Sequence, residues 1–127
     1  MRGSALLAGM IALAGCAAHD PGMLVEQGYQ RGALGVAAIE RGDQATAEAQ
    51  LNELRGVKAD DPARLINLGK VYADTGRVDD AVRVWRLALA SSRQFEVVTA
   101  NGRVVRTDQL AREALARYEP AVETASR

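Results

Sequence analysis

The spacing of hydrophobic residues changes along the chain, and each change predicts a different element. From Ala5 to Gly15 small and apolar residues run without a charge. Between residues 28 and 95 they instead recur at separated positions among polar residues. FEVVTANGRVVRT, residues 95–107, is rich in β-branched residues, and TDQLAREALARYEP, residues 107–120, has helical spacing. The abundance of alanine and leucine favours a mainly helical protein.

The β-branched stretch predicts a short hairpin. Asn101-Gly102 favours a two-residue type I′ turn. That turn would pair Val98 with Val105 and Thr99 with Val104. A lone hairpin is only marginally stable, so we expect its valines to rest on the helix that follows. The apolar positions of that helix are Leu110, Ala114, Leu115 and Tyr118.

The middle of the chain contains an internal repeat. When residues 28–61 are placed on residues 62–95, a shift of 34, several small and apolar positions coincide. The matched pairs are Leu34 with Leu68, Gly35 with Gly69, Gly42 with Gly76, Ala47 with Ala81, and Leu51 with Trp85.

The second copy, ARLINLGKVYADTGRVDDAVRVWRLALA, resembles a tetratricopeptide repeat. The residues at that family's key columns are Leu65, Leu68, Gly69, Tyr72, Gly76, Ala81, Trp85 and Ala88. The first copy, YQRGALGVAAIERGDQATAEAQLNELRG, keeps the small residues and loses the aromatic ones. The resemblance implies two antiparallel helices per repeat, with Gly69 facing Ala81. Gly42 and Gly76 would end the first helix of each pair as left-handed caps.

These patterns predict a mainly α protein: an antiparallel helix-pair superhelix of about two repeats, a short β-hairpin and a C-terminal capping helix. The repeat region would cover residues 23–93, with units 28–61 and 62–95. The hairpin and capping helix would cover residues 94–119, and a flexible tail residues 120–127. Because two repeats rarely bury a continuous core, we expect the hairpin and last helix to seal the open end. The alternative is that the hairpin edge pairs with a strand of a partner.

Residues 1–15 have the layout of a secretory signal, with Arg2 before the apolar run and small residues after it. The run is shorter than the roughly 20 residues that span a bilayer. Leu13-Ala14-Gly15-Cys16 resembles a bacterial lipobox. The resemblance implies cleavage before Cys16, acyl chains on Cys16 and a lipidated tether at residues 16–22. The alternatives are an ordinary cleaved signal or a buried thiol.

Ala17 stands where an aspartate often retains such lipoproteins at the inner membrane. The analogy therefore favours lipid anchoring to the bacterial outer membrane, on its periplasmic face.

Composition narrows the function classes. The formal net charge is zero and aromatic residues are 4% of the chain, so we expect no nucleic-acid partner. The only histidine, His19, lies in the predicted tether. Asp60-Asp61 and Asp79-Asp80 fit helix starts better than a metal site. We therefore expect no enzyme, metal, cofactor or small-molecule substrate.

A binding surface remains as the expected functional feature. The family resemblance places the first helix of each repeat on a concave face. Eight residues are candidates for binding a protein or peptide there: Tyr29, Val36, Ile39, Glu40, Ile66, Asn67, Lys70 and Asp74. It is left open whether the N-terminal segment covers Tyr29, Val36 and Ile39.

The favoured hypothesis is a membrane-anchored scaffold or adaptor in the cell envelope that binds a peptide or helix of an assembly machine. One alternative is a self-associating structural lipoprotein, which exposed Trp85 and Tyr118 would favour. Another is a pilotin-like accessory factor of a pilus or secretin system.

Overall fold

The computed structural model describes residues 26–127, except for the side chain of Ala121. The predicted signal at residues 1–15, Cys16 and the tether at residues 16–22 lie outside the described residues.

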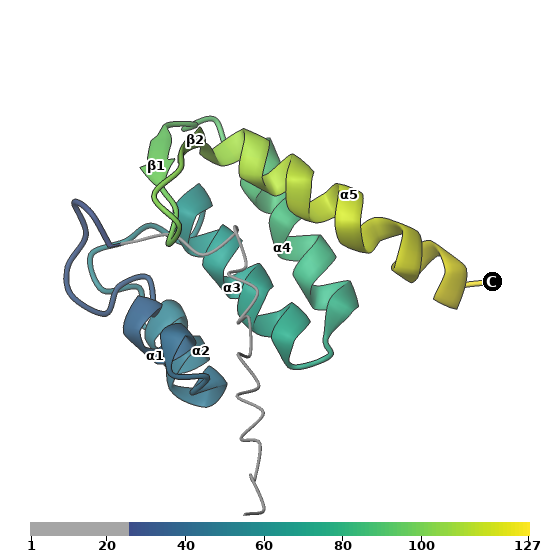
Figure 1. Cartoon of the computed structure of the whole chain (residues 1–127), viewed down its shortest axis with the longest axis horizontal. Coiled ribbons are helices and arrows are strands. Elements are labelled where there is room, and N and C mark those ends of the chain that lie inside the picture. Colours follow the sequence, from purple (N-terminus) through teal and green to yellow (C-terminus); the bar gives the residue numbers. More distant parts are fainter. Residues whose placement is uncertain (1–25) are drawn as a thin grey trace, which may run out of the picture.

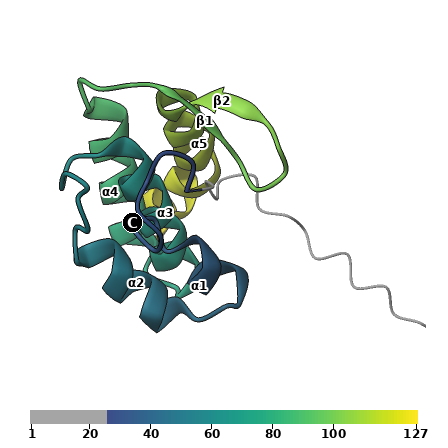
Figure 2. The same ribbon diagram turned by 90° about the vertical axis from the view of Figure 1, so that its left-hand side faces the viewer.

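Residues 26–127 form packed helices and one small sheet, as predicted (Figure 1). The elements are α1 (Val36–Glu40), α2 (Gln44–Asn52), α3 (Pro62–Asp74), α4 (Val78–Ala90), β1 (Glu96–Val98), β2 (Val104–Arg106) and α5 (Thr107–Ala125). Helix α3 packs against α2 and α4, and α5 packs against α4 and α3. The hairpin lies at the upper edge of the molecule and α1 and α2 at the lower edge in both views (Figure 2).

The helix pair α3–α4 has the predicted boundaries. The Asp61 side chain accepts a hydrogen bond from the Arg64 N–H at 3.1 Å, and Pro62 opens α3. Gly76 follows α3 with φ +79°, which confirms its role as a left-handed cap. Asp79 and Asp80 lie in the first turn of α4, where the helix dipole favours negative charge.

Gly69 makes room for an aromatic ring. A Cβ atom on Gly69 would lie 2.2 Å from Trp85 Nε1. The indole N–H donates to the Ile66 carbonyl at 3.1 Å, and the ring lies 5.1 Å from the Tyr118 ring, centroid to centroid. The three nearest atoms to that Cβ position all belong to Trp85, and the expected contact of Gly69 with Ala81 stays a prediction. The indole takes the space beside Gly69 because it also hydrogen-bonds the backbone of α3.

The first repeat is less helical than the second. Helix α1 has only five residues, and turns occupy most of residues 26–35. Gly32 and Gly35 adopt φ +82° and +65°, which a continuous helix does not allow. The Glu26 carboxylate accepts from the Gly32 and Leu34 N–H groups at 2.8 and 2.9 Å. A side chain thus supplies hydrogen bonds that a longer helix would have made internally.

Arg64 joins the two repeats. Its side chain is 7% exposed, and Nε donates to the Leu51 carbonyl at 2.6 Å, in the last turn of α2. Its two other guanidinium nitrogens donate to the Ala59 carbonyl and the Asn52 side chain, at 2.9 and 3.2 Å. Burial lowers the pKa of Arg64. The guanidinium satisfies the Leu51 carbonyl, which the end of α2 leaves free, and the Ala59 carbonyl in the loop before α3.

The hairpin register differs from the prediction by one residue. Val98 pairs with Val104 and Val97 with Val105. The connection is a three-residue loop in which Gly102 takes φ +81°, instead of a two-residue turn. A one-residue slip exchanges the two faces of a strand. In the observed register Val105 is buried and Val104 is 67% exposed.

Helix α5 continues through Pro120 to Ala125, so the predicted tail at residues 120–127 is corrected. Proline cannot donate a backbone hydrogen bond. The helix continues because Val122 still packs against the core, and the Thr124 hydroxyl donates to the Pro120 carbonyl at 2.8 Å. Leu110 and Leu115 of α5 join the same core as Val105 of β2, so the hairpin and last helix cover the end of the helix stack.

Candidate functional site

The eight candidate residues come from three parts of the fold. Tyr29 lies in the turns before α1; Val36, Ile39 and Glu40 lie on α1; Ile66, Asn67, Lys70 and Asp74 lie on α3. The Asn67 side-chain N–H donates to the Leu34 carbonyl at 2.9 Å, so the turn that leads into α1 lies beside α3.

Three of the eight residues belong to the interior. Ile39 is 7% exposed, Ile66 is 2% exposed and Asn67 is fully buried. The two isoleucines belong to the hydrophobic core. The Asn67 amide supplies a donor for the Leu34 carbonyl, which precedes the break at Gly35. In this conformation these residues stabilise the fold, and their assignment to partner binding stays a prediction.

Tyr29 and Val36 are half-buried. The Tyr29 hydroxyl lies 3.2 and 3.1 Å from the two carboxylate oxygens of Asp61 and donates to that group. Burial, and then the charge of Asp61, raise the pKa of Tyr29 well above its usual value. Tyr29 thereby ties the turns before α1 to the N-cap of α3.

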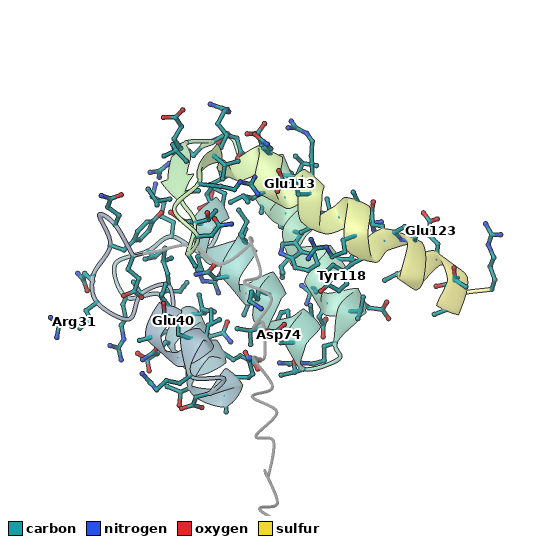
Figure 3. All side chains as sticks on the ribbon, viewed as in Figure 1. Arg31, Glu40, Asp74, Glu113, Tyr118 and Glu123 are labelled. Carbon is teal, nitrogen blue, oxygen red and sulfur yellow. The ribbon has the colours of Figure 1, made fainter. Side chains whose placement is uncertain are left out.

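Two of the more exposed candidates, Lys70 and Asp74, form a polar cluster with Gln44, and we define the cluster as Gln44, Lys70 and Asp74. Lys70 Nζ lies 2.7 Å from Asp74 Oδ2, and the two side chains are 14% and 29% exposed. The Gln44 amide N–H donates to the same oxygen at 3.3 Å. Glu40 is exposed on α1, and Figure 3 shows it and Asp74 in the lower part of the molecule.

Gln44 was missed by the sequence reasoning. It is the first residue of α2, directly after the N-cap Asp43. Its Oε1 atom is buried and accepts no hydrogen bond from residues 26–127. The local signal in the sequence was the place of Gln44 directly after a helix cap. Its closeness to the end of α3 depends on the stacking of the two repeats.

The cluster can recognise polar groups, because exposed carboxylates accept hydrogen bonds and attract cations. Within residues 26–127, no three histidine, cysteine, aspartate or glutamate side chains gather as a metal site would require. None of the helices formed by those residues has the length and hydrophobicity needed to cross a bilayer.

Comparison with known proteins identifies the repeats. Residues 29–53 and 62–86 each match the tetratricopeptide repeat family. No curated protein and no solved structure matches the chain. The two matches cover α1–α2 and most of α3–α4, which are the helix pairs described above. The chain therefore contains two tetratricopeptide repeats, which suggest a protein partner.

Proposed function

We propose that this protein is a membrane-anchored scaffold of the bacterial cell envelope, which binds a peptide or helix of another envelope protein at its polar cluster. The observation that supports this most directly is the contact of Lys70 and Asp74 of the second repeat with Gln44 of the first, with Glu40 exposed on α1. Glu40 lies on the first helix of the first repeat, and Lys70 and Asp74 lie on the first helix of the second. The apolar candidates are mostly buried, so the recognition surface that remains is polar.

The polar cluster and the exposed Glu40 favour a partner segment that presents a cation and backbone N–H groups. Glu40 has no ion pair with any residue in 26–127, and Asp74 is shared by Lys70 and Gln44. A partner cation beside Glu40 would gain a charge partner at little desolvation cost. Exposed ion pairs contribute only about 0–1 kcal/mol each, so the interface we propose is weak.

A membrane anchor makes a weak interface useful. Leu13-Ala14-Gly15-Cys16 supports lipidation of Cys16, and Ala17 supports the periplasmic face of the outer membrane. Two partners on one surface meet at a raised effective concentration, so a shallow site is sufficient. A pilotin-like accessory factor is one form of this role. We propose binding without catalysis.

Self-association through aromatic residues has little support. Trp85 is 3% exposed, and Tyr118 is half-buried against its ring. Neither residue presents a large apolar surface to a second copy.

The test is site-specific photo-crosslinking in cells of the native organism. The probe replaces Glu40, and the matched control replaces Glu123, an exposed glutamate on α5 (Figure 3). We expect one discrete adduct from position 40 alone, identified by mass spectrometry. Equal adduct patterns from the two positions, or adducts only between copies of this chain, would contradict the proposed site.

The anchor has a separate test. Wild type and Cys16→Ala are compared by membrane fractionation and by mass spectrometry of the N-terminal peptide. We expect a lipid-modified Cys16 in the wild type and release of the variant from the membrane fraction. An unmodified wild-type Cys16 would refute the lipid anchor and leave the binding site to be judged by the crosslinks.

A further inference from the structure

The hairpin has an open edge beside a small pocket. The pocket has a volume of about 140 Å³ and is lined by Gln27, Tyr29, Phe95, Glu96, Val97, Val98 and Val104. Four of these residues are valines or phenylalanine. Val97 and Val98 belong to β1 itself, so the pocket borders this strand.

The hydrogen-bond register shows which backbone groups are free for pairing. The Thr107 N–H donates to the Phe95 carbonyl at 3.0 Å, and the Thr99 N–H donates to the Arg103 carbonyl at 2.9 Å. In an antiparallel pair, hydrogen-bonded and non-hydrogen-bonded residues alternate. The N–H and C=O groups of Glu96 and Val98 therefore point away from β2. No hydrogen bond from within residues 26–127 reaches them.

The outward face of the hairpin combines a charged pair, Glu96 and Arg106, with an apolar pair, Val98 and Val104. Val104 is 67% exposed and lies opposite Val98, which lines the pocket. An exposed edge with adjacent apolar side chains is a ready template for one more strand. Two strands alone are marginally stable, and a third adds both backbone pairing and burial.

The chain itself supplies a matching segment. The Glu26 carboxylate is held by the Gly32 and Leu34 N–H groups, and its neighbour Gln27 lines the pocket. The three residues before Glu26 are Met23, Leu24 and Val25, and all three are apolar. At about 3.5 Å per residue they reach roughly 10 Å from Glu26. Their number equals the three residues of β1, and Pro21-Gly22 would end a strand before them.

We propose that Met23-Leu24-Val25 adds as a third strand to the free edge of β1 and fills this pocket. The covalent link through Glu26 keeps the segment at high local concentration, which an unlinked strand from another protein would have to match. The occupant is therefore this chain's own segment in preference to a partner's strand or a second copy.

This docking would shorten the tether. If Cys16 carries the lipid, residues 17–22 alone would separate the anchor from the docked strand. Six extended residues span about 20 Å, so the hairpin side of the molecule would face the membrane. The inference itself does not require the lipid or the proposed partner.

Disulfide trapping tests the placement. The full chain carries Cys16→Ser, so that introduced cysteines are the only ones. Val98→Cys is combined in turn with Met23→Cys, Leu24→Cys and Val25→Cys. The matched control combines the same three with Leu87→Cys, an exposed residue of α4. A disulfide forms readily only when the two Cα atoms are about 4.4–6.8 Å apart.

We expect at least one fast, intramolecular crosslink to position 98 and none to position 87. Equal crosslinking to both positions, covalent dimers in place of the intramolecular product, or no crosslink to position 98 would each overturn the proposal. A dimer would identify a second copy as the occupant.

Hydrogen exchange gives an independent readout. The Val98 amide should exchange at least about tenfold more slowly in the Cys16→Ser chain than in the same chain with Met23, Leu24 and Val25 all changed to serine. The Val97 amide, which bonds within the hairpin, is the internal reference. Equal exchange of Val98 in the two proteins, with Val97 protected in both, would refute the added strand.

Discussion

The two repeats match the same family and fold differently. In the second, α3 and α4 each have 13 residues, and Trp85 packs on Gly69. In the first, α1 has five residues and α2 has nine. The glycine at the shared column serves different purposes. Gly69 leaves space for a ring, whereas Gly35 adopts φ +65° and ends the turns before α1.

The difference shows that an aromatic residue on the second helix of a repeat changes the role of the glycine on the first helix. Leu51 occupies the column of Trp85, and its Cγ lies 3.4 Å from where a Cβ on Gly35 would be. A leucine has no N–H to donate to the preceding helix. The first repeat instead depends on polar side chains from elsewhere, namely Glu26, Asn67 and Arg64.

The largest expected effect comes from Gly69→Ala. The new Cβ would overlap the Trp85 indole, displacing it from the Ile66 carbonyl and from Tyr118. We expect a loss of about 3 kcal/mol in the free energy of unfolding, despite the better helix propensity of alanine. Urea unfolding followed by circular dichroism measures it.

The matched background is Trp85→Leu, which copies the residue of the first repeat. In that background Gly69→Ala should cost much less, because the ring is gone. Additive effects of the two substitutions would show that the ring does not decide the role of Gly69.

Arg64→Met tests what holds the first repeat to the second. The substitution removes the donors to the Leu51 and Ala59 carbonyls. We expect a loss of about 2 kcal/mol, since these bonds come from a charged and buried group. The control Arg86→Met removes an exposed pair with Glu119 and should cost at most about 1 kcal/mol. Equal losses for the two variants in thermal unfolding would contradict the junction role.

Gly35→Ala should cost more than Gly42→Ala, although both glycines have positive φ. For each, the left-handed backbone alone costs an alanine about 1 kcal/mol. At Gly35 the Cβ would also lie 3.2 Å from the Ala47 carbonyl oxygen, whereas at Gly42 it meets no atom within 4 Å. Chemical denaturation of both variants measures the difference. If they proved equally stable, the contact of Gly35 with α2 would be loose.

The smallest expected effect is a pH dependence at the start of α2. The hydrogen bond from Thr46 to the Asp43 side chain lowers the pKa of that carboxyl. A depressed folded-state pKa stabilises the protein above the unfolded value near 4, and this stabilisation is lost as pH falls through the folded-state pKa. Asp43→Asn keeps the cap without the titration. Its stability should therefore fall less than that of the wild type between about pH 5 and pH 2. Parallel curves for the two proteins would contradict this.

The candidate site was predictable only in part. The family columns placed Lys70 and Asp74 on one helix, and in the structure they form an ion pair. The same columns placed Ile66 and Asn67 on the concave face, where both are buried. Column positions indicate which side of a helix a residue occupies. They do not indicate that a turn of an irregular neighbouring segment, at Leu34, lies against Asn67.

Local sequence determined the helix boundaries of the second repeat, the left-handed caps at Gly42 and Gly76, and the existence of the hairpin, because these depend on residues close together in the chain. Tertiary structure alone decided the remaining features. The hairpin register, the continuation of α5 through Pro120, the position of Trp85 on Gly69 and the contact of Gln44 with Asp74 all involve packing between elements. Such contacts are selected by the shape and hydrogen-bonding needs of distant neighbours, which a local pattern does not contain.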